Sequence, residues 1–352
     1  MRLNLHSLIQ AHLLKRSPLS YLLYPLGKLY GAYQSLRRRY LFPRPYHAPC
    51  KVISIGNIVS GGSGKTPLTI AIARLLSEQG IRVAVSHRGY KGKFENHPHL
   101  ISDSKSLLYP ADVAGDEAWL IASSLPGIPV VVGRKRKAAI HLLLKSYPAT
   151  QVIIMDDTFQ HLKVFRDLDI VSFATESGIG NGFVLPAGYL RESLNALTDK
   201  CIAVVYRMQQ THTPKAWEAL IQAKTPHVYH SYATATECID ARGNPFAIDS
   251  LKGKRLVLVS GIAHPKSFEK TVKELGLKYI KHNIYPDHYS FDDDNITPKL
   301  LHEHPDIILC TQKDIMKLAR HPELAPRLKA LVLSYQFDEQ EEFHHQINLI
   351  LS

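Results

Sequence analysis

The chain has 352 residues, of which 45% are hydrophobic and 21% are charged, a composition that excludes a peptide, a disulfide mini-protein and a disordered or fibrous chain. At roughly 150 residues per domain, the length predicts about two domains. The 43 Lys and Arg residues outnumber the 31 Asp and Glu residues and give a formal net charge of +12, which predicts an anionic partner. The four cysteines show no CxxC spacing, so we expect neither a disulfide framework nor a zinc site.

Residues 1–50 form a basic, apolar segment, and the first acidic residue of the chain is Glu78. Its apolar runs are short and interrupted by Pro18 and Pro25, which argues against a membrane-spanning helix, and no small-residue cleavage site follows them. Two interpretations stay open: a helix lying in an anionic membrane interface and a helix packed on the protein core. Both depend on an apolar stripe that ends in three arginines: Leu19, Leu22, Leu23, Leu26, Leu29, Tyr30, Tyr33, Arg37, Arg38 and Arg39.

From residue 51 onward, short β-branched runs alternate with helical patterns, which is typical of an α/β fold with a mostly parallel sheet and helices on both faces. Expected strands are 52–55, 82–86, 130–132, 152–155, 169–173 and 202–206, then 255–259, 278–280, 307–310 and 331–335. Residues 225–250 resemble a hairpin with a turn at 241–245. We therefore expect an N-terminal segment (1–50), a P-loop domain (51–222) and a smaller C-terminal α/β domain (223–352).

The strongest local pattern is K-V-I-S-I-G-N-I-V-S-G-G-S-G-K-T at residues 51–66. A strand, a glycine-rich turn and a helix to about Glu78 are typical of a P-loop, whose backbone N–H groups surround phosphate. Lys65 would reach the β- and γ-phosphates of ATP, and the Thr66 hydroxyl would ligate Mg²⁺. Val59 stands where the full pattern has glycine; a plain glycine-rich turn is the alternative. The expected nucleotide-binding residues are Ser60, Gly61, Gly62, Ser63, Gly64, Lys65 and Thr66.

Two carboxylates, Asp156 and Asp157, follow the buried run 152–155. Ligands collect at the carboxyl ends of strands in such sheets, and a P-loop requires an acidic group for its metal ion. A helix cap is the alternative interpretation. We expect Asp156 and Asp157 to join Thr66 around Mg²⁺.

Five further motifs follow one another along the chain: S-H-R-G-Y-K (86–91), A-G-D-E-A (114–118), D-D-T-F-Q-H (156–161), L-P-A-G-Y-L-R-E (185–192) and P-D-H-Y (286–289). Their order and spacing resemble those of the tetraacyldisaccharide 4'-kinases of lipid A biosynthesis, and the resemblance covers essentially the whole chain. The resemblance implies a Mg²⁺-dependent transfer of the ATP γ-phosphate to the 4'-hydroxyl of an acylated glucosamine disaccharide 1-phosphate. It also implies a peripheral protein on the anionic cytoplasmic face of the bacterial inner membrane, with neither a nucleic-acid nor a protein partner.

The resemblance assigns roles to individual residues. Asp116 would be the catalytic base, with His288 supporting it and Asp287 fixing the His288 tautomer. Lys65 is the catalytic cation, and Gln160 contacts the nucleotide. The implied substrate contacts are Arg88, Tyr90, Glu117, Arg136 and Arg191.

Several residues depart from the family pattern. Thr158 replaces an expected glycine, and Lys135 replaces the usual aspartate before Arg136. Tyr189 and Ser193 replace the usual asparagine and proline of the L-P-A-G loop. Two other functions are weighed against the kinase: a soluble P-loop switch or metallochaperone, and a nucleic-acid binder, for which no recognition module is present. We expect the active site between the two α/β domains.

Overall fold

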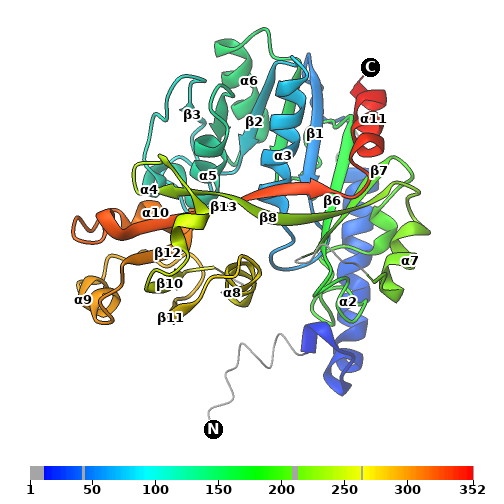
Figure 1. Ribbon diagram of the computed structural model, residues 1–352. Coiled ribbons are helices and arrows are strands. Elements are labelled where there is room, and N and C mark those ends of the chain that lie inside the picture. The colour runs from blue at the N-terminus through cyan, green and yellow to red at the C-terminus, as the bar shows by residue number, and fades with distance from the viewer. Residues whose placement is uncertain (1–11, 42–43, 208–212, 263–264, 352) are drawn as a thin grey trace.

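The computed structural model describes residues 12–41, 44–207, 213–262 and 265–351. Its strands form one continuous sheet of 13 strands in the order β11-β10-β12-β13-β8-β7-β6-β1-β5-β2-β4-β3, with β9 paired to β8 (Figure 1). This arrangement confirms the expected mostly parallel α/β fold.

The strands of the P-loop half are parallel except β3, which is antiparallel to β4. They are β1 (Lys51–Gly56), β2 (Val83–His87), β3 (His99–Ser102), β4 (Val130–Val132), β5 (Val152–Asp156), β6 (Leu168–Ala174) and β7 (Cys201–Arg207). The predicted strands of this half are confirmed. The sequence analysis missed β3, because a four-residue edge strand that begins with His99 and ends with Ser102 shows little apolar alternation.

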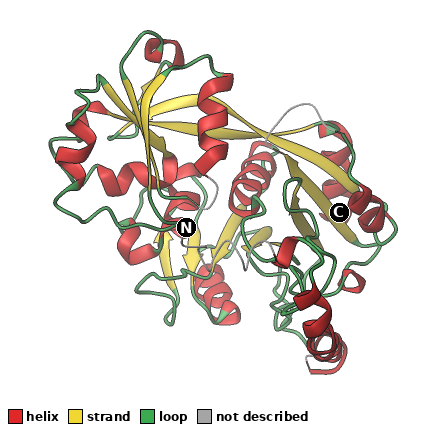
Figure 2. Ribbon diagram, turned by 90° about the horizontal axis from the view of Figure 1, so that it is seen from below, coloured by secondary structure: helices red, strands yellow, loops and turns green. Residues whose placement is uncertain are grey.

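Helices cover both faces of this half (Figure 2). They are α3 (Lys65–Glu78), α4 (Ala111–Ala114), α5 (Asp116–Ser124), α6 (Arg136–Ser146) and α7 (Ala216–Gln222). Successive side chains of a strand point to opposite faces. Ile53 therefore joins the core beneath α3 and α5, whereas its neighbour Val52 packs with Ile140 of α6.

The C-terminal half begins with the long strand β8 (Val228–Asp240), which forms the expected hairpin with β9 (Pro245–Phe246). The remaining elements are β10 (Leu256–Ser260), α8 (Pro265–Glu274), β11 (Tyr279–Ile284), α9 (Ile296–Leu301), β12 (Ile307–Thr311), α10 (Gln312–Leu318), β13 (Leu328–Phe337) and α11 (Gln340–Leu351), with 3-10 turns at Leu194–Ala196, Ile248–Leu251 and Ala325–Arg327.

Strands β8 and β13 join the two halves. They pair antiparallel from Lys329 opposite Asp240 to Phe337 opposite Ser231, while β8 is parallel to β7 and β13 is parallel to β12. Phe343 of α11 lies in the same hydrophobic cluster as the P-loop helix α3. The chain therefore crosses between the halves twice, and the domain boundary near residue 222 stays a prediction.

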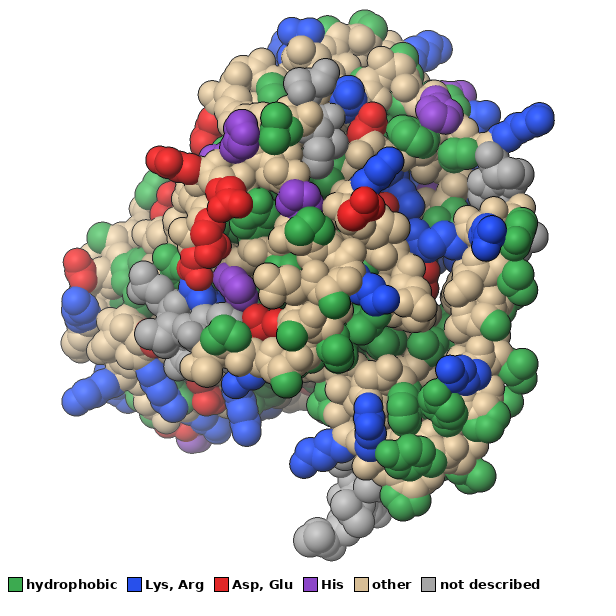
Figure 3. Space-filling model, turned by 90° about the vertical axis from the view of Figure 1, so that its right-hand side faces the viewer, with side chains coloured by type: hydrophobic (Ala, Val, Ile, Leu, Met, Phe, Trp, Pro, Cys, Tyr) green, Lys and Arg blue, Asp and Glu red, His purple; other side chains and the backbone are tan. Residues whose placement is uncertain are grey.

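Before the sheet, α2 (Pro18–Leu36) continues into a π-helix (Arg37–Leu41). Its buried positions are Ser20, Gly27 and Gln34, and an added Cβ at Gly27 would lie 2.8 Å from the Val184 carbonyl oxygen. Most large apolar side chains of α2 are exposed, whereas Leu23 and Tyr30 are half-buried. Most of the apolar stripe therefore does not pack on the core. Figure 3 shows hydrophobic and basic side chains together at the lower end of the molecule. Within the described ranges, no helix combines the length and hydropathy that crossing a bilayer requires.

Candidate active site

The P-loop connects β1 to α3, as the sequence predicts. Gly61 and Gly64 adopt positive φ angles of 95° and 76°, a conformation that favours glycine because a Cβ would be strained there. The Asn57 side chain crosses the loop and donates to Ser63 Oγ at 2.9 Å and to the Gly61 carbonyl at 3.3 Å. The sequence analysis did not identify Asn57, which braces the loop from inside through these two hydrogen bonds.

Asp156 ends β5, next to β1 in the sheet, so its carboxylate lies beside the start of α3. Its Oδ2 accepts from the Thr66 hydroxyl at 3.2 Å, and its Oδ1 accepts from the Thr69 hydroxyl at 3.0 Å. Burial raises the pKa of Asp156, and His87 partly opposes this effect. Carboxylate and hydroxyl oxygens are the ligands that Mg²⁺ prefers, so these residues fit the metal that the P-loop implies. Thr69 had no sequence signal.

Asp157 lies beside the two cations expected near phosphate. Its Oδ1 is 3.5 Å from Lys65 Nζ and 4.0 Å from a guanidinium nitrogen of Arg191. Lys65 comes from the P-loop and Arg191 from the L-P-A-G loop, and both lie near the same carboxylate. The structure thus brings Lys65, Asp157 and Arg191 together at the carboxyl edge of the sheet.

His87, which the sequence analysis passed over, links Asp156 to Glu117. Its Nε2 lies 3.6 Å from Glu117 Oε2 and 3.9 Å from Asp156 Oδ2. The backbone N–H of Gly89 donates to His87 Nδ1 at 3.0 Å, so Nε2 carries the proton that faces the carboxylates. The interaction with His87 lowers the pKa of Glu117 to about 2. His87 therefore holds Glu117 on the side of Asp156.

Asp116 begins α5 and meets residues of the C-terminal half. His288 Nδ1 lies 3.1 Å from Asp116 Oδ2, and Lys317 Nζ donates to the same oxygen at 2.5 Å. Burial by itself would raise the pKa of Asp116, but the hydrogen bonds from His288 and Lys317 outweigh it and leave the pKa below its ordinary value. Asp287 Oδ2 is 3.8 Å from His288 Nε2, beyond hydrogen-bond distance. Lys313 lies closer, at 3.4 Å.

The other expected contacts fall into two groups. Arg88 pairs with Glu95 at 2.7 Å and lies over the half-exposed ring of Tyr90, so both residues border the surface of the site. Arg136 is 3% exposed and donates to the Asp156 carbonyl at 2.7 Å; burial lowers its pKa to about 10. Arg136 therefore supports the strand end from below, and its contact with substrate stays a prediction.

Gln160 and the L-P-A-G loop hold the P-loop from outside. Gln160 Nε2 donates to the Asn57 carbonyl at 2.8 Å, and the Ser60 N–H donates to the Tyr189 carbonyl at 2.9 Å. A Cβ added at Gly61 would lie only 2.6 Å from the Tyr189 hydroxyl. The Tyr189 side chain, which departs from the family pattern, thus packs against the P-loop. Direct contact of Gln160 with nucleotide stays a prediction.

The Thr158 departure is also accommodated. Its hydroxyl donates to the Met155 carbonyl at 2.9 Å and to Ser54 Oγ at 3.1 Å. The positive φ angle of this turn falls on Asp157, at 51°, and not on Thr158. Glycine is therefore not needed at position 158.

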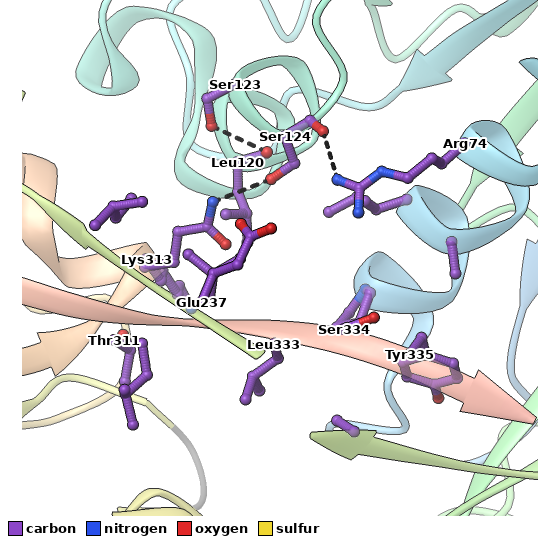
Figure 4. A pocket seen from close by; sticks show the side chains of 18 of the residues that line it. Arg74, Leu120, Ser123, Ser124, Glu237, Thr311, Lys313, Leu333, Ser334 and Tyr335 are labelled. Carbon is purple, nitrogen blue, oxygen red and sulfur yellow. Dashed lines mark hydrogen bonds between the residues drawn. The ribbon is translucent and has the colours of Figure 1, made fainter. Parts of the chain in front are cut away.

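A cavity of about 910 Å³ lies beside the site, between α3 and α5 on one side and β8 and β13 on the other (Figure 4). On the helical side, Arg74 of α3 donates to the Ser124 carbonyl of α5 at 3.1 Å. Lys313 lines the cavity and also contacts His288. The cavity therefore extends to Lys313, beside His288, while Ser60–Thr66 and Asp156 do not line it.

Comparison with known proteins agrees with this geometry. A family model described as tetraacyldisaccharide-1-P 4'-kinase matches residues 19–352. A tetraacyldisaccharide 4'-kinase of Syntrophus aciditrophicus is 33% identical over 351 residues, covering 94% of this chain and 93% of that protein. One from Psychrobacter cryohalolentis is 36% identical over 335 residues, covering 90% and 85%.

A solved structure shows the same fold. The crystal structure of an "apo" form of LpxK from Aquifex aeolicus in complex with ATP matches with a TM-score of 0.76 and 27% identity, covering 95% of this chain and 100% of that one. The family model covers far more than half of the chain, and the relatives exceed 30% identity over most of it. The chain therefore belongs to the tetraacyldisaccharide 4'-kinase family.

Proposed function

We propose that this chain transfers the γ-phosphate of ATP to the 4'-hydroxyl of a tetraacyl glucosamine disaccharide 1-phosphate, a step of lipid A biosynthesis. The observation that carries the proposal is the carboxylate of Asp116, held by His288 and Lys317 on the helix that also brings Glu117 toward the P-loop acids. A P-loop switch or metallochaperone would need no such acceptor-side base. The names of the relatives and the ATP complex of the solved neighbour support the same reaction.

On the nucleotide side, the P-loop N–H groups and the start of α3 would bind the phosphates. Lys65 would neutralise charge on the β- and γ-oxygens, because its ammonium lies at the beginning of α3. Thr66, Asp156 and Asp157 would hold Mg²⁺. When bound, Mg²⁺ would supply positive charge to the phosphate oxygens in the transition state.

On the acceptor side, Asp116 would accept the proton of the sugar hydroxyl. A hydroxyl is a weak nucleophile, and a carboxylate within hydrogen-bond distance removes its proton as the new bond to phosphorus forms. His288 and Lys317 bind one oxygen of Asp116, so the other can face the substrate. The bond between the γ-phosphorus and ADP breaks in the same transfer.

The exposed stripe of α2 supports a peripheral site on the anionic cytoplasmic face of the inner membrane. Leu22 is 75% exposed and Leu29 is 69% exposed, and no acidic residue interrupts residues 12–41. Apolar side chains would enter the interface while Lys and Arg side chains bind anionic headgroups. This position would also present the lipid acceptor to the site.

The test is phosphate transfer to the lipid itself. The purified full-length protein is incubated with Mg²⁺, γ-labelled ATP and acyl disaccharide 1-phosphate in detergent, and the product is analysed by mass spectrometry and by NMR of the 4' position. We expect one phosphate per disaccharide at the 4'-oxygen. ATP hydrolysis without labelling of the lipid, or labelling at another hydroxyl, would contradict the proposal.

A further inference from the structure

The carboxylate of Asp116 is bound asymmetrically. Its Oδ2 receives both His288 Nδ1, at 3.1 Å, and Lys317 Nζ, at 2.5 Å. Its Oδ1 receives no hydrogen bond from any residue in the ranges that the structure covers. One oxygen is therefore fixed by the protein, and the other is left for a hydroxyl group of a substrate.

Lys317 is not an ordinary surface cation. It lies on α10, 201 positions along the chain from Asp116, and its side chain is only 8% exposed. Its ammonium also donates to the Tyr289 carbonyl at 3.1 Å. A buried ammonium requires a counter-charge and hydrogen-bond acceptors, and these two contacts hold it against Asp116.

Lys313, one turn earlier on α10, lies beside the ring nitrogen of His288 that faces away from Asp116. Its Nζ donates to Asp287 Oδ1 at 2.9 Å and lies 3.4 Å from His288 Nε2. An ammonium has donors only, so Nε2 must present its lone pair to Lys313. The proton of the imidazole then lies on Nδ1, where it is donated to Asp116.

We infer that Lys317 and Lys313 are positioning residues for phosphate transfer: Lys317 keeps Asp116 ionised with Oδ1 turned toward the acceptor hydroxyl, and Lys313 fixes the tautomer in which His288 donates to Asp116. The inference rests on the proposed function. During transfer, the hydroxyl proton moves to Asp116 Oδ1 while its oxygen bonds to phosphorus and ADP leaves with the electron pair of the broken P–O bond. The C-terminal half thus contributes two cations besides His288.

The other charged groups near Asp116 are already engaged. On its own helix, Glu117 turns toward His87. Asp112, one turn earlier in the chain, pairs with Arg320 at 3.2 Å, and both side chains are more than 40% exposed. Exposed pairs of this kind contribute little. The Arg320–Asp112 pair crosses between the same two halves without touching Asp116, so it is the matched control.

The experiment compares the full-length wild type with Lys317→Met, Lys317→Arg and Arg320→Met. For Lys317→Met we expect kcat for lipid phosphorylation to fall on the order of 10-fold or more at pH 7, with little change in the KM for ATP. Loss of the cation favours protonated Asp116, so the acid limb of the kcat profile should move to higher pH. Lys317→Arg should return the acid limb of the kcat profile to the pH at which the wild type has it. Arg320→Met should match the wild type in both kcat and pH profile.

A merely structural Lys317 would leave the acid limb where the wild type has it, and that result would overturn the inference. Asp116→Asn is assayed in parallel. If it keeps wild-type activity, the proposed catalytic base is wrong as well. If it is inactive while Lys317→Met is wild-type-like, only the role of Lys317 fails.

A second measurement does not depend on the folding of a Lys317 variant. The ¹⁵N chemical shifts of the His288 ring in the wild-type protein report its tautomer. We expect protonated Nδ1 and unprotonated Nε2, and redistribution between the tautomers in Lys313→Met. A wild-type ring protonated at Nε2 alone would overturn the assignment to Lys313.

Discussion

His288 reaches Asp116 because of one local feature of the backbone. It adopts a positive φ of 63°, and its N–H donates to the Gly261 carbonyl at 3.2 Å. A non-glycine residue rarely takes this conformation, and it is common at functional sites. The turn directs the imidazole across 172 sequence positions to the start of α5.

The pairing of Asp116 with His288 predicts a non-additive loss of activity. Asp116→Ala and His288→Ala should each lower kcat for lipid phosphorylation on the order of 10²-fold or more, while nucleotide affinity changes little. Because the two residues act as a unit, the double variant should be scarcely worse than the worse single one. Steady-state kinetics on the four proteins, with ATP affinity measured separately by titration, decide this. If the loss of kcat in the double variant is the product of the two single losses, Asp116 and His288 act independently and the pairing is wrong.

Glu117 predicts a pH-dependent contribution to stability. Its pKa of about 2 in the folded protein lies below the ordinary value of 4.5, so its ionised form stabilises the fold at any pH above the unfolded-state pKa. That contribution shrinks as pH falls from about 4.5 toward 2. Urea unfolding of wild type and Glu117→Gln from pH 7 to pH 3 should give a stability gap that is constant near neutrality and narrows in acid. If the difference in free energy of unfolding between the two proteins does not vary with pH, Glu117 does not have a lowered pKa in the folded protein.

At the scale of elements, α2 docks through its smallest side chains. Gly27 faces the Val184 carbonyl, whereas at Gly31 an added Cβ would meet only Val184 methyl groups at 3.8 Å and 4.0 Å, which is ordinary contact. Asn181 donates to Ser20 Oγ at 3.2 Å and ties the same helix to the L-P-A-G region. Most of the apolar stripe is thereby left on the outside, with Leu23 and Tyr30 half-buried.

These two glycines make a matched pair. Gly27→Ala places a Cβ 2.8 Å from a backbone oxygen and should destabilise the protein by about 1–3 kcal/mol. Gly31→Ala has room and should be neutral or stabilising by up to about 1 kcal/mol, because alanine favours helix more than glycine does. Free energies of unfolding in urea test both. Equal effects at the two positions would mean that α2 does not dock through Gly27.

The exposed leucines of α2 predict membrane affinity. Leu22→Asp and Leu29→Asp should each lower binding to anionic phospholipid vesicles on the order of 10- to 10²-fold, since each removes about 1.5–3 kcal/mol of apolar burial. Leu220→Asp on α7 is the control, because Leu220 is also exposed, at 52%, but lies outside α2. Vesicle sedimentation measures all three. Equal partitioning of all variants would show that α2 does not bind the membrane.

At the scale of the whole molecule, local patterns predicted the P-loop, the two acids at the end of β5 and most strands, because each depends on neighbouring residues. Contacts between distant segments could not be predicted in this way. Lys317 and Asp116 lie 201 positions apart, and Thr69, His87 and Asn57 act through side chains that no local pattern distinguishes. The α2 stripe left two interpretations open because hydrophobic periodicity cannot detect a docking face made of Ser20, Gly27 and Gln34.

The continuous sheet explains why distant motifs form one site. Strands β1 and β5 place Lys65 and Asp156 at one edge, and the β8–β13 pair carries the chain into and out of the half that supplies His288 and Lys317. The P-loop half thereby supplies the nucleotide-side groups and Asp116, and the C-terminal half supplies His288 and Lys317, which hold Asp116. The central claim is that both sets serve one phosphate transfer.

The rate of label transfer from ATP to the lipid in Lys65→Met tests that claim most directly. In the proposed reaction, Lys65 neutralises charge that develops on the phosphates, so the variant should lose on the order of 10²- to 10³-fold in kcat while its thermal unfolding matches the wild type. Leu220→Asp changes an exposed side chain of α7 that has no role in the proposed transfer, so it should phosphorylate lipid in detergent at the wild-type rate. Wild-type transfer by Lys65→Met would contradict the account, because the γ-phosphate would then not be held at the P-loop.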